Sequence, residues 1–282
     1  MSTLAVDIGG TKFSMAVFDG DEMVIRESRG TDREGGRDWM LDQIVQLGRD
    51  WKRSFGYDRC GIGFGGPVMY TLQRIQQSTH VGGWHDFALP QYIEGTLKVP
   101  AIMDNDANVG AIGESEYGAA QGCEDFFYMT LSTGIGGGVI IGGEVYRGQD
   151  CFAGEIGHTT IRPDGPACLC GGCGCLERMC SGLWLEKDHG KPASDLMKDP
   201  DFVSRYVVDL ALGLKNCIML LNPESIIIGG GISKAGDALF RPLREELRRQ
   251  ITNWSHARID VRPALLADDS VLYGAQVMAN QL

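Results

Sequence analysis

The feature that most constrains this chain is a cysteine cluster in residues 154–177, which read GEIGHTTIRPDGPACLCGGCGCLE. Four cysteines fall within eight positions, and His158 lies ten residues before the first; the four are Cys168, Cys170, Cys173 and Cys175. Thiols this close together do not suit a hydrophobic core, and the glycines and prolines between them predict a loop. Zinc takes four soft or borderline ligands in a tetrahedron, so His158 and three of the cysteines predict a zinc loop. A disulfide or a set of free thiols is the alternative.

Composition and charge exclude several classes of protein. The chain has 282 residues, of which 43% are hydrophobic, and this is enough for one large or two medium domains. A net charge of -11 disfavours a nucleic-acid partner, because such a partner selects a basic surface. The N-terminal sequence lacks the pattern of a signal peptide, and no apolar run is long enough to span a membrane. Nine clustered cysteines indicate a reducing cytoplasm, so we expect a cytoplasmic protein without a membrane partner.

Two short segments each predict a β-hairpin with a glycine-rich turn. The first has strands at 4–7 and 13–18, joined by Gly9-Gly10-Thr11-Lys12. This is not the strand–loop–helix of a dinucleotide fold or of a Walker A loop. Small residues let backbone N–H groups face a phosphate, although an ordinary hairpin turn is the alternative. Residues 125–141 repeat the pattern around a turn at 132–138, so we expect two similar halves that hold one nucleotide.

An acidic segment follows a predicted strand at 100–103. It reads Asp104-Asn105-Asp106-Ala107-Asn108 and leads into a predicted helix that extends to Gly118. Carboxylates at a strand-to-helix junction are well placed to meet a substrate. A helix N-cap is the alternative, since Asn and Asp are preferred there, but a cap does not require so many polar residues.

The remaining periodicity places helices and strands in alternation. Helices are predicted at 38–54, 90–97, 203–221, 237–252 and 269–280, and further strands at 61–68, 223–228 and 259–265. This alternation predicts the α/β class.

Taken together, the motifs resemble the ROK family of bacterial sugar kinases and repressors. The resemblance depends on Asp7-Ile8-Gly9-Gly10-Thr11-Lys12, Asn105-Asp106-Ala107, the turn at 133–138, Gly157-His158 and the run from Cys168 to Glu177. It implies the actin-like, ribonuclease-H-like α/β fold with two domains and a cleft between them. We expect a small domain at 1–112, with the closing helix at 267–282 packed back on it, and a large domain at 113–266 that carries the zinc loop.

The resemblance also implies roles for individual residues. Asp106 is expected to be the catalytic base. Sugar hydroxyls are expected to be held by Asn105, Asp106, Glu155, His158 and Glu177. The zinc ligands are expected to be His158, Cys168, Cys170 and Cys175, which leaves Cys173 as an additional thiol. ATP, with Mg²⁺ near Asp7, is expected to bind at Asp7, Gly9, Gly10, Thr11, Lys12, Thr133, Gly134, Gly136, Gly137, Gly229, Gly230 and Gly231.

The function that this resemblance implies is an ATP-dependent hexokinase that phosphorylates glucose and forms a homodimer. N-acetylmannosamine, mannose, fructose and allose are alternative sugars, and polyphosphate is an alternative phosphoryl donor. The loop at 80–84 is expected to border the sugar. A repressor is disfavoured because the first hairpin begins seven residues into an acidic chain. A sugar-binding protein without catalysis is the alternative from another class.

Overall fold

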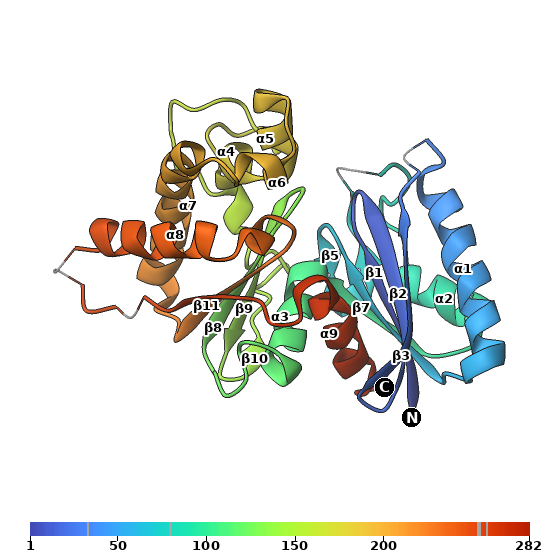
Figure 1. Cartoon of the computed structure of the whole chain (residues 1–282). Helices are drawn as coiled ribbons and strands as arrows, with labels where there is room; N and C mark the ends of the chain where they lie inside the picture. The colour runs from blue at the N-terminus through green and yellow to red at the C-terminus, as the bar shows by residue number, and fades with distance from the viewer. Residues whose placement is uncertain (33, 79–80, 253–254, 258) are drawn as a thin grey trace. The chain divides into compact units, whose positions relative to one another are not determined.

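The computed structural model describes residues 1–32, 34–78, 81–252, 255–257 and 259–282, and it divides into two compact units (Figure 1). Unit 1 consists of Met1–Tyr117, Arg147–Phe152 and Asp269–Leu282, and unit 2 of Gly118–Tyr146 and Ala153–Asp268. The sequence predicts other limits, with a small domain at 1–112 and 267–282 and a large domain at 113–266. These limits stay a prediction. His80 of the loop at 80–84 lies outside the described residues.

Unit 1 is built on a five-stranded sheet with the order β3-β2-β1-β4-β7. The strands are β1 (Ser2–Ile8), β2 (Lys12–Asp19), β3 (Glu22–Gly30), β4 (Arg59–Phe64) and β7 (Ala101–Asn105). The first three form an antiparallel meander; β4 pairs with β1 in parallel, and β7 pairs with β4 in parallel. The short strands β5 (Val68–Met69) and β6 (Arg74–Ile75) form a separate pair beside the helix η1 (Tyr70–Leu72).

Helices cover both faces of this sheet (Figure 1). They are α1 (Gly36–Phe55), α2 (Leu89–Leu97), α3 (Asp106–Tyr117) and α9 (Ser270–Ala279). Alternate residues of β1 serve the two faces, as the period of a strand requires. Leu4 and Val6 pack with α1 and α2, whereas Ala5 packs with α3 and α9.

Unit 2 repeats this sheet, with the order β10-β9-β8-β11-β12. The strands are β8 (Phe126–Leu131), β9 (Ile135–Ile141), β10 (Glu144–Val145), β11 (Ser225–Gly229) and β12 (Val261–Pro263). An antiparallel meander again precedes two parallel strands. The repeat that the two glycine hairpins predict is therefore present in the topology of both sheets.

The core of unit 2 lies between its sheet and two long helices, α7 (Pro200–Leu221) and α8 (Asp237–Gln250). Shorter elements join the strands: η2 (Ile156–His158), α4 (Leu176–Cys180), α5 (Gly182–His189), α6 (Ala193–Leu196), η3 (Ile232–Ala235) and η4 (Ala267–Asp269). Apolar residues of the three inner strands face the apolar stripes of the helices, and this burial is the main stabilising contribution.

The sequence pattern did not predict several elements, among them β3, α5 and α6. The strand β3 is an edge strand in which exposed and half-buried residues alternate, and four of its nine residues are charged, as is typical of protected edges. The helices α5 and α6 are short, and α5 buries only Leu185, so neither carries a sustained apolar stripe.

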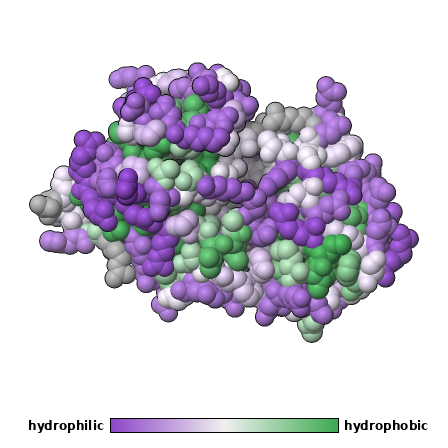
Figure 2. Space-filling view, viewed as in Figure 1, coloured by the Kyte–Doolittle hydropathy of each residue, from purple (hydrophilic) through white to green (hydrophobic). Residues whose placement is uncertain are grey.

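Hydrophilic residues predominate on the face of the molecule shown in Figure 2. Among the described residues, no helix combines the length and the hydrophobicity needed to cross a membrane.

Glycines allow the close approach of α3 and α9. A methyl group on Gly274 would lie 1.7 Å from the carbonyl oxygen of Val109, and one on Gly113 would lie 2.1 Å from that of Ser270. We predict that Gly274→Ala forces the helices apart and lowers the free energy of unfolding by at least about 1–3 kcal/mol. Urea denaturation followed by circular dichroism measures this change.

The matched control is Gly95→Ala in α2, where a methyl group would meet no atom within 4 Å. This variant should keep the stability of the wild type or gain up to about 1 kcal/mol from helix propensity. Equal midpoints for the two variants would contradict the close contact.

Candidate functional site

The first glycine turn joins β1 to β2 and lies against the end of β4. The amide of Gly9 donates to the carbonyl of Lys12 at 3.0 Å, and the amide of Gly65 donates to the carbonyl of Ile8 at 2.8 Å. Gly9 and Gly10 are half-buried, and Thr11 and Lys12 are exposed. The predicted Mg²⁺ partner Asp7 is half-buried in β1 just before this turn.

The acidic segment forms the junction of β7 and α3. Asn105 ends the strand and Asp106 begins the helix. The side-chain oxygen of Asn105 accepts from the amide of Ala107 at 2.9 Å, and its Nδ2 donates to the carbonyl of Gly66 at 3.0 Å. The capping interpretation therefore applies to Asn105.

Asp106 lies beside the first glycine turn. A methyl group on Gly65 would come within 3.3 Å of the Asp106 Oδ2 and within 3.5 Å of the Gly9 Cα. Unit 1 therefore brings the predicted base and one predicted phosphate-binding turn together. A side chain at position 65 would make tight contacts with both.

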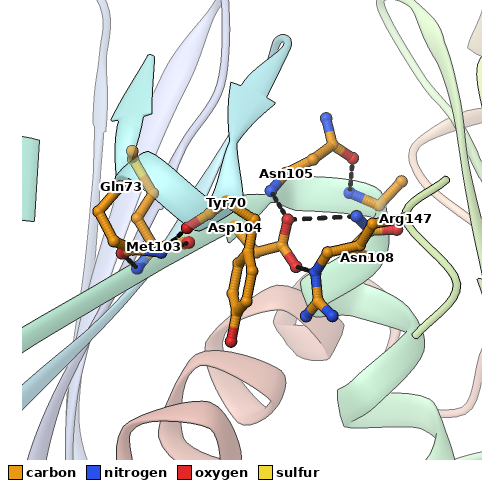
Figure 3. Close-up of polar contacts among 8 residues, drawn as sticks. Tyr70, Gln73, Met103, Asp104, Asn105, Asn108 and Arg147 are labelled. Carbon is orange, nitrogen blue, oxygen red and sulfur yellow. Dashed lines mark hydrogen bonds and ion pairs between the residues drawn. The ribbon is translucent and has the colours of Figure 1, made fainter. Parts of the chain in front are cut away.

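Asp104, two residues before the predicted base, is fully buried and ion-paired. Its Oδ2 lies 2.8 Å from Nε of Arg147 (Figure 3). Burial raises the pKa of the Asp104 carboxyl, and Arg147 and hydrogen bonds from Asn108 and the Asn105 amide oppose the shift. The sequence does not pair Asp104 with Arg147, because the two residues are far apart in the chain.

The second glycine turn, between β8 and β9, is held by the start of α5. The amide of Gly182 donates to the carbonyl of Ser132 at 2.7 Å, and that of Leu183 donates to the carbonyl of Thr133 at 3.1 Å. Within the turn, the Ser132 amide donates to the carbonyl of Gly134 at 3.0 Å. The end of a helix therefore supports the turn.

The glycines after β11 lie against the same turn. Gly230 has a positive φ of 87°, and a methyl group on it would lie 2.5 Å from the carbonyl oxygen of Leu131. A methyl group on Gly231 would lie 3.9 Å from Oγ of Ser132. Unit 2 thus brings together two of the segments predicted to bind the nucleotide.

A cavity of about 610 Å³ opens beside Gly231, within unit 2. Its volume is in the range of small-molecule sites. Most of the lining residues come from α6, the start of α7, η3 and α8, and the sequence did not predict them as site residues. The lining residues with charged side chains are Lys198, Lys234, Asp237, Arg241 and Glu245. Of the lining residues, only Gly231 was predicted from the sequence to bind the nucleotide.

The cysteine loop gathers four potential metal ligands. The ligand atoms of His158, Cys168, Cys170 and Cys175 lie within 4.8 Å of one another. Sγ of Cys170 is 3.6 Å from that of Cys175, and Sγ of Cys168 is 3.9 Å from Nδ1 of His158. Three thiols and an imidazole at this spacing fit the ligand set of tetrahedral zinc. Cys173 is exposed and does not belong to this group.

Three residues predicted to hold the sugar lie beside this loop. Nε2 of His158 is 4.0 Å from Oε2 of Glu155. Burial raises the pKa of Glu155, the nearby Glu177 raises it further, and His158 lowers it. Oε2 of Glu177 accepts from the amide of Ile135 at 2.9 Å, so one oxygen of this carboxylate already supports the second glycine turn.

Main-chain contacts with β9 fix the segment that carries Glu155 and His158. A methyl group on Gly154 would lie 2.1 Å from the carbonyl oxygen of Gly137, and one on Gly157 would lie 2.2 Å from that of Ile135. Gly137 is equally enclosed, with Phe127 and Gly154 against it. Gly136 follows Ile135 in β9 and is half-buried.

The sequence profile of the ROK family matches residues 3–282. The chain belongs to the ROK family. The predicted membership is therefore confirmed, and with it the actin-like α/β fold that the family's solved structures share with this chain.

Individual ROK proteins match over the whole chain. A glucokinase of Halalkalibacterium halodurans is 33% identical, and the match covers 99% of this chain and 94% of that protein. A ROK hexokinase from Thermus thermophilus is 32% identical with a TM-score of 0.84, covering 100% of this chain and 98% of that one. A ROK glucokinase from Streptomyces griseus, solved with glucose and AMPPNP, is 27% identical with a TM-score of 0.88 and full coverage of both chains.

The cysteine geometry predicts the metal content of two variants. Cys175→Ser removes a ligand and should lower the zinc content well below about one ion per chain, together with the melting temperature, because metal binding stabilises the fold. Cys173→Ser is the matched control and should change neither value. Elemental analysis and thermal unfolding measure both. Loss of zinc from Cys173→Ser would contradict the proposed ligand set.

Proposed function

We propose that this protein is an ATP-dependent hexokinase that converts glucose to glucose 6-phosphate, with Asp106 as general base. The full-length similarity to a glucokinase of Halalkalibacterium halodurans and to a glucose and AMPPNP complex from Streptomyces griseus supports this activity. The observation that carries it in this chain is the position of Asp106 beside Gly65 and the first glycine turn.

The chemistry suits a carboxylate at this place. A sugar hydroxyl is a poor nucleophile, and a carboxylate can accept its proton as the oxygen attacks the γ-phosphorus. The new bond forms between the sugar oxygen and phosphorus, the bond to the β-phosphate oxygen breaks, and ADP leaves. The proton stays on Asp106 until solvent removes it.

The sugar is proposed to be held by Asn105, Glu155, His158 and Glu177. Adjacent hydroxyls of a pyranose suit bidentate acceptors, and carboxylates form the stronger, charge-assisted hydrogen bonds. Oε2 of Glu177 is bonded to the amide of Ile135, so we assign the sugar contact to its other oxygen. One oxygen of the Glu177 carboxylate would then bind the sugar while the other binds the strand that follows the second glycine turn.

ATP is proposed to occupy the cavity beside Gly231 and to extend its phosphates to the glycine turns. Backbone amides of Gly9–Lys12 and of the turn at 133–137 would then face the phosphates. Gly229, Gly230 and Gly231 would line the path between the cavity and the second turn. Mg²⁺ bound with ATP supplies positive charge for the phosphates, and Asp7 is its proposed partner through water.

Zinc is proposed as a structural ion on His158, Cys168, Cys170 and Cys175. Coordination through Nδ1 of His158 would fix the ring and direct Nε2 towards Glu155 and the sugar. We also propose a cytoplasmic homodimer. The other sugars, polyphosphate as donor, and sugar binding without catalysis remain the competing proposals.

Removal of the base tests the mechanism. Asp106→Asn should lower kcat by about 10²–10⁴-fold while the sugar still binds, because the amide keeps the shape of the side chain but accepts no proton. A coupled ADP-release assay measures kcat, and calorimetry measures sugar binding. The matched control is Asp42→Asn on the exposed face of α1, which should change neither. Retained turnover in Asp106→Asn would remove Asp106 from the role of base.

Substrate preference tests the reaction itself. With Mg-ATP and a panel of glucose, mannose, N-acetylmannosamine, fructose and allose, kcat/KM should be highest for glucose. The same panel with polyphosphate tests the donor. A clear preference for another sugar would replace glucose in the proposal and keep the kinase. No turnover with any sugar or donor, by folded protein with zinc bound, would favour sugar binding without catalysis.

A further inference from the structure

The side chain of Arg147 is enclosed between two groups of unit 1. Its guanidinium carbon lies 3.7 Å from the centre of the Tyr70 ring, and its Nε lies 2.8 Å from Oδ2 of Asp104. The side chain of Asp104 is 2% exposed and that of Arg147 is 22% exposed. Loss of the half-buried Arg147 would leave the charge of the buried Asp104 carboxylate uncompensated, and this is destabilising.

The segment that carries Arg147 is unusual in the chain. Arg147–Phe152 belongs to unit 1, although the residues before and after it belong to unit 2. Arg147 is the first residue of this segment. Its side chain contacts Asp104 and the ring of Tyr70 (Figure 3).

The second oxygen of Asp104 binds the start of α3. Oδ1 accepts from the amide of Asn105 at 2.7 Å and from Nδ2 of Asn108 at 3.2 Å. Asn105 in turn caps the helix through the amide of Ala107 (Figure 3). One carboxylate therefore connects Arg147 with the residues on both sides of Asp106.

Tyr70 is also tied to β7. Gln73 donates from Nε2 to the carbonyl of Tyr70 at 2.7 Å and accepts at Oε1 from the amide of Met103 at 2.7 Å. The main chain of Tyr70, whose ring contacts Arg147, is therefore linked through Gln73 to the strand that carries Asp104. Arg147 thus lies between two fixed groups, and its planar guanidinium satisfies both at once.

We propose that Arg147 is a positioning residue for phosphoryl transfer, which acts through Asp104 to fix the orientation of Asp106 at the start of α3. This inference rests on the proposed function, in which Asp106 is the base. Arg147 does not contact the reacting atoms. A displacement of about 1 Å in a catalytic group can cost on the order of 10²-fold in rate, so a small shift at this junction is enough.

The test compares four variants with the wild type: Arg147→Gln, Arg147→Lys, the double variant Arg147→Gln with Asp104→Asn, and Arg26→Gln. Arg26 is the matched control, because it also forms an ion pair in unit 1, with Asp269 at 2.6 Å, away from the β7–α3 junction. The double variant removes both charges, so it avoids a buried carboxylate without a partner and provides a folded protein if Arg147→Gln fails to fold.

We expect Arg147→Gln and the double variant to lower kcat by roughly 10- to 100-fold, with the dissociation constants of sugar and ATP analogue changed by less than about threefold. Arg147→Lys keeps the charge but loses the planar stack, and it should recover part of kcat. Arg26→Gln should keep the wild-type kcat. If Arg147 contributed only to stability, its substitution would lower the melting temperature, but the folded variant would keep the wild-type kcat.

Several results would overturn the proposal. One is a wild-type kcat in the double variant, and another is a loss of binding that accounts for the whole loss of activity. Asp106→Asn is measured in parallel, so that a failure of the proposed base can be distinguished from a failure of the positioning role of Arg147. If Asp106→Asn loses turnover and Arg147→Gln keeps it, the positioning role fails and the proposed base stands. If Asp106→Asn keeps turnover, the proposed base fails and the positioning role fails with it.

Discussion

The contact between the main chain of β9 and the segment at 154–158 is the constraint on which most of unit 2 depends. Gly154 and Gly157 lie directly against the carbonyl groups of Gly137 and Ile135, where no side chain fits. This contact places Glu155 and His158 beside a strand that begins at the second glycine turn. Glu177 binds the same strand from the other end of the cysteine loop. The ligand cluster, the candidate sugar carboxylates and the turn are therefore parts of one rigid assembly.

In unit 1 a buried charge adds to the close glycine contacts. Its acidic segment is fixed by a buried carboxylate that accepts hydrogen bonds from two sides, while the neighbouring carboxylate of Asp106 stays half-buried near the first turn. Two acidic residues of the same strand-to-helix junction thus have different surroundings. Asp104 is buried and ion-paired with Arg147, which suits a structural role, whereas Asp106 is the proposed base.

Local patterns carried most of what the sequence could predict. The glycine turns, the long apolar helices and the cysteine set all have signals within a few residues, and the structure contains each of them. The strand β3 and the helices α5 and α6 lacked such signals, because an exposed edge and short helices have no sustained apolar period. For another reason, the sequence could not predict the ion pair between Asp104 and Arg147 or the residues that line the cavity. They join distant segments, and one sequence contains no record of such contacts.

The equal strand order of the two sheets has a consequence for the history of the chain. In unit 1 the path from the third strand of the meander to the fourth strand of the sheet consists of α1 alone, from β3 to β4. In unit 2 the corresponding path, from β10 to β11, also contains the cysteine loop and the helices α4, α5 and α6 before α7 takes the place of α1. Duplication of an ancestral half, followed by one insertion in the second copy, accounts for this difference. The proposed metal ligands, together with Glu155 and Glu177, would then be younger than the sheet that supports them.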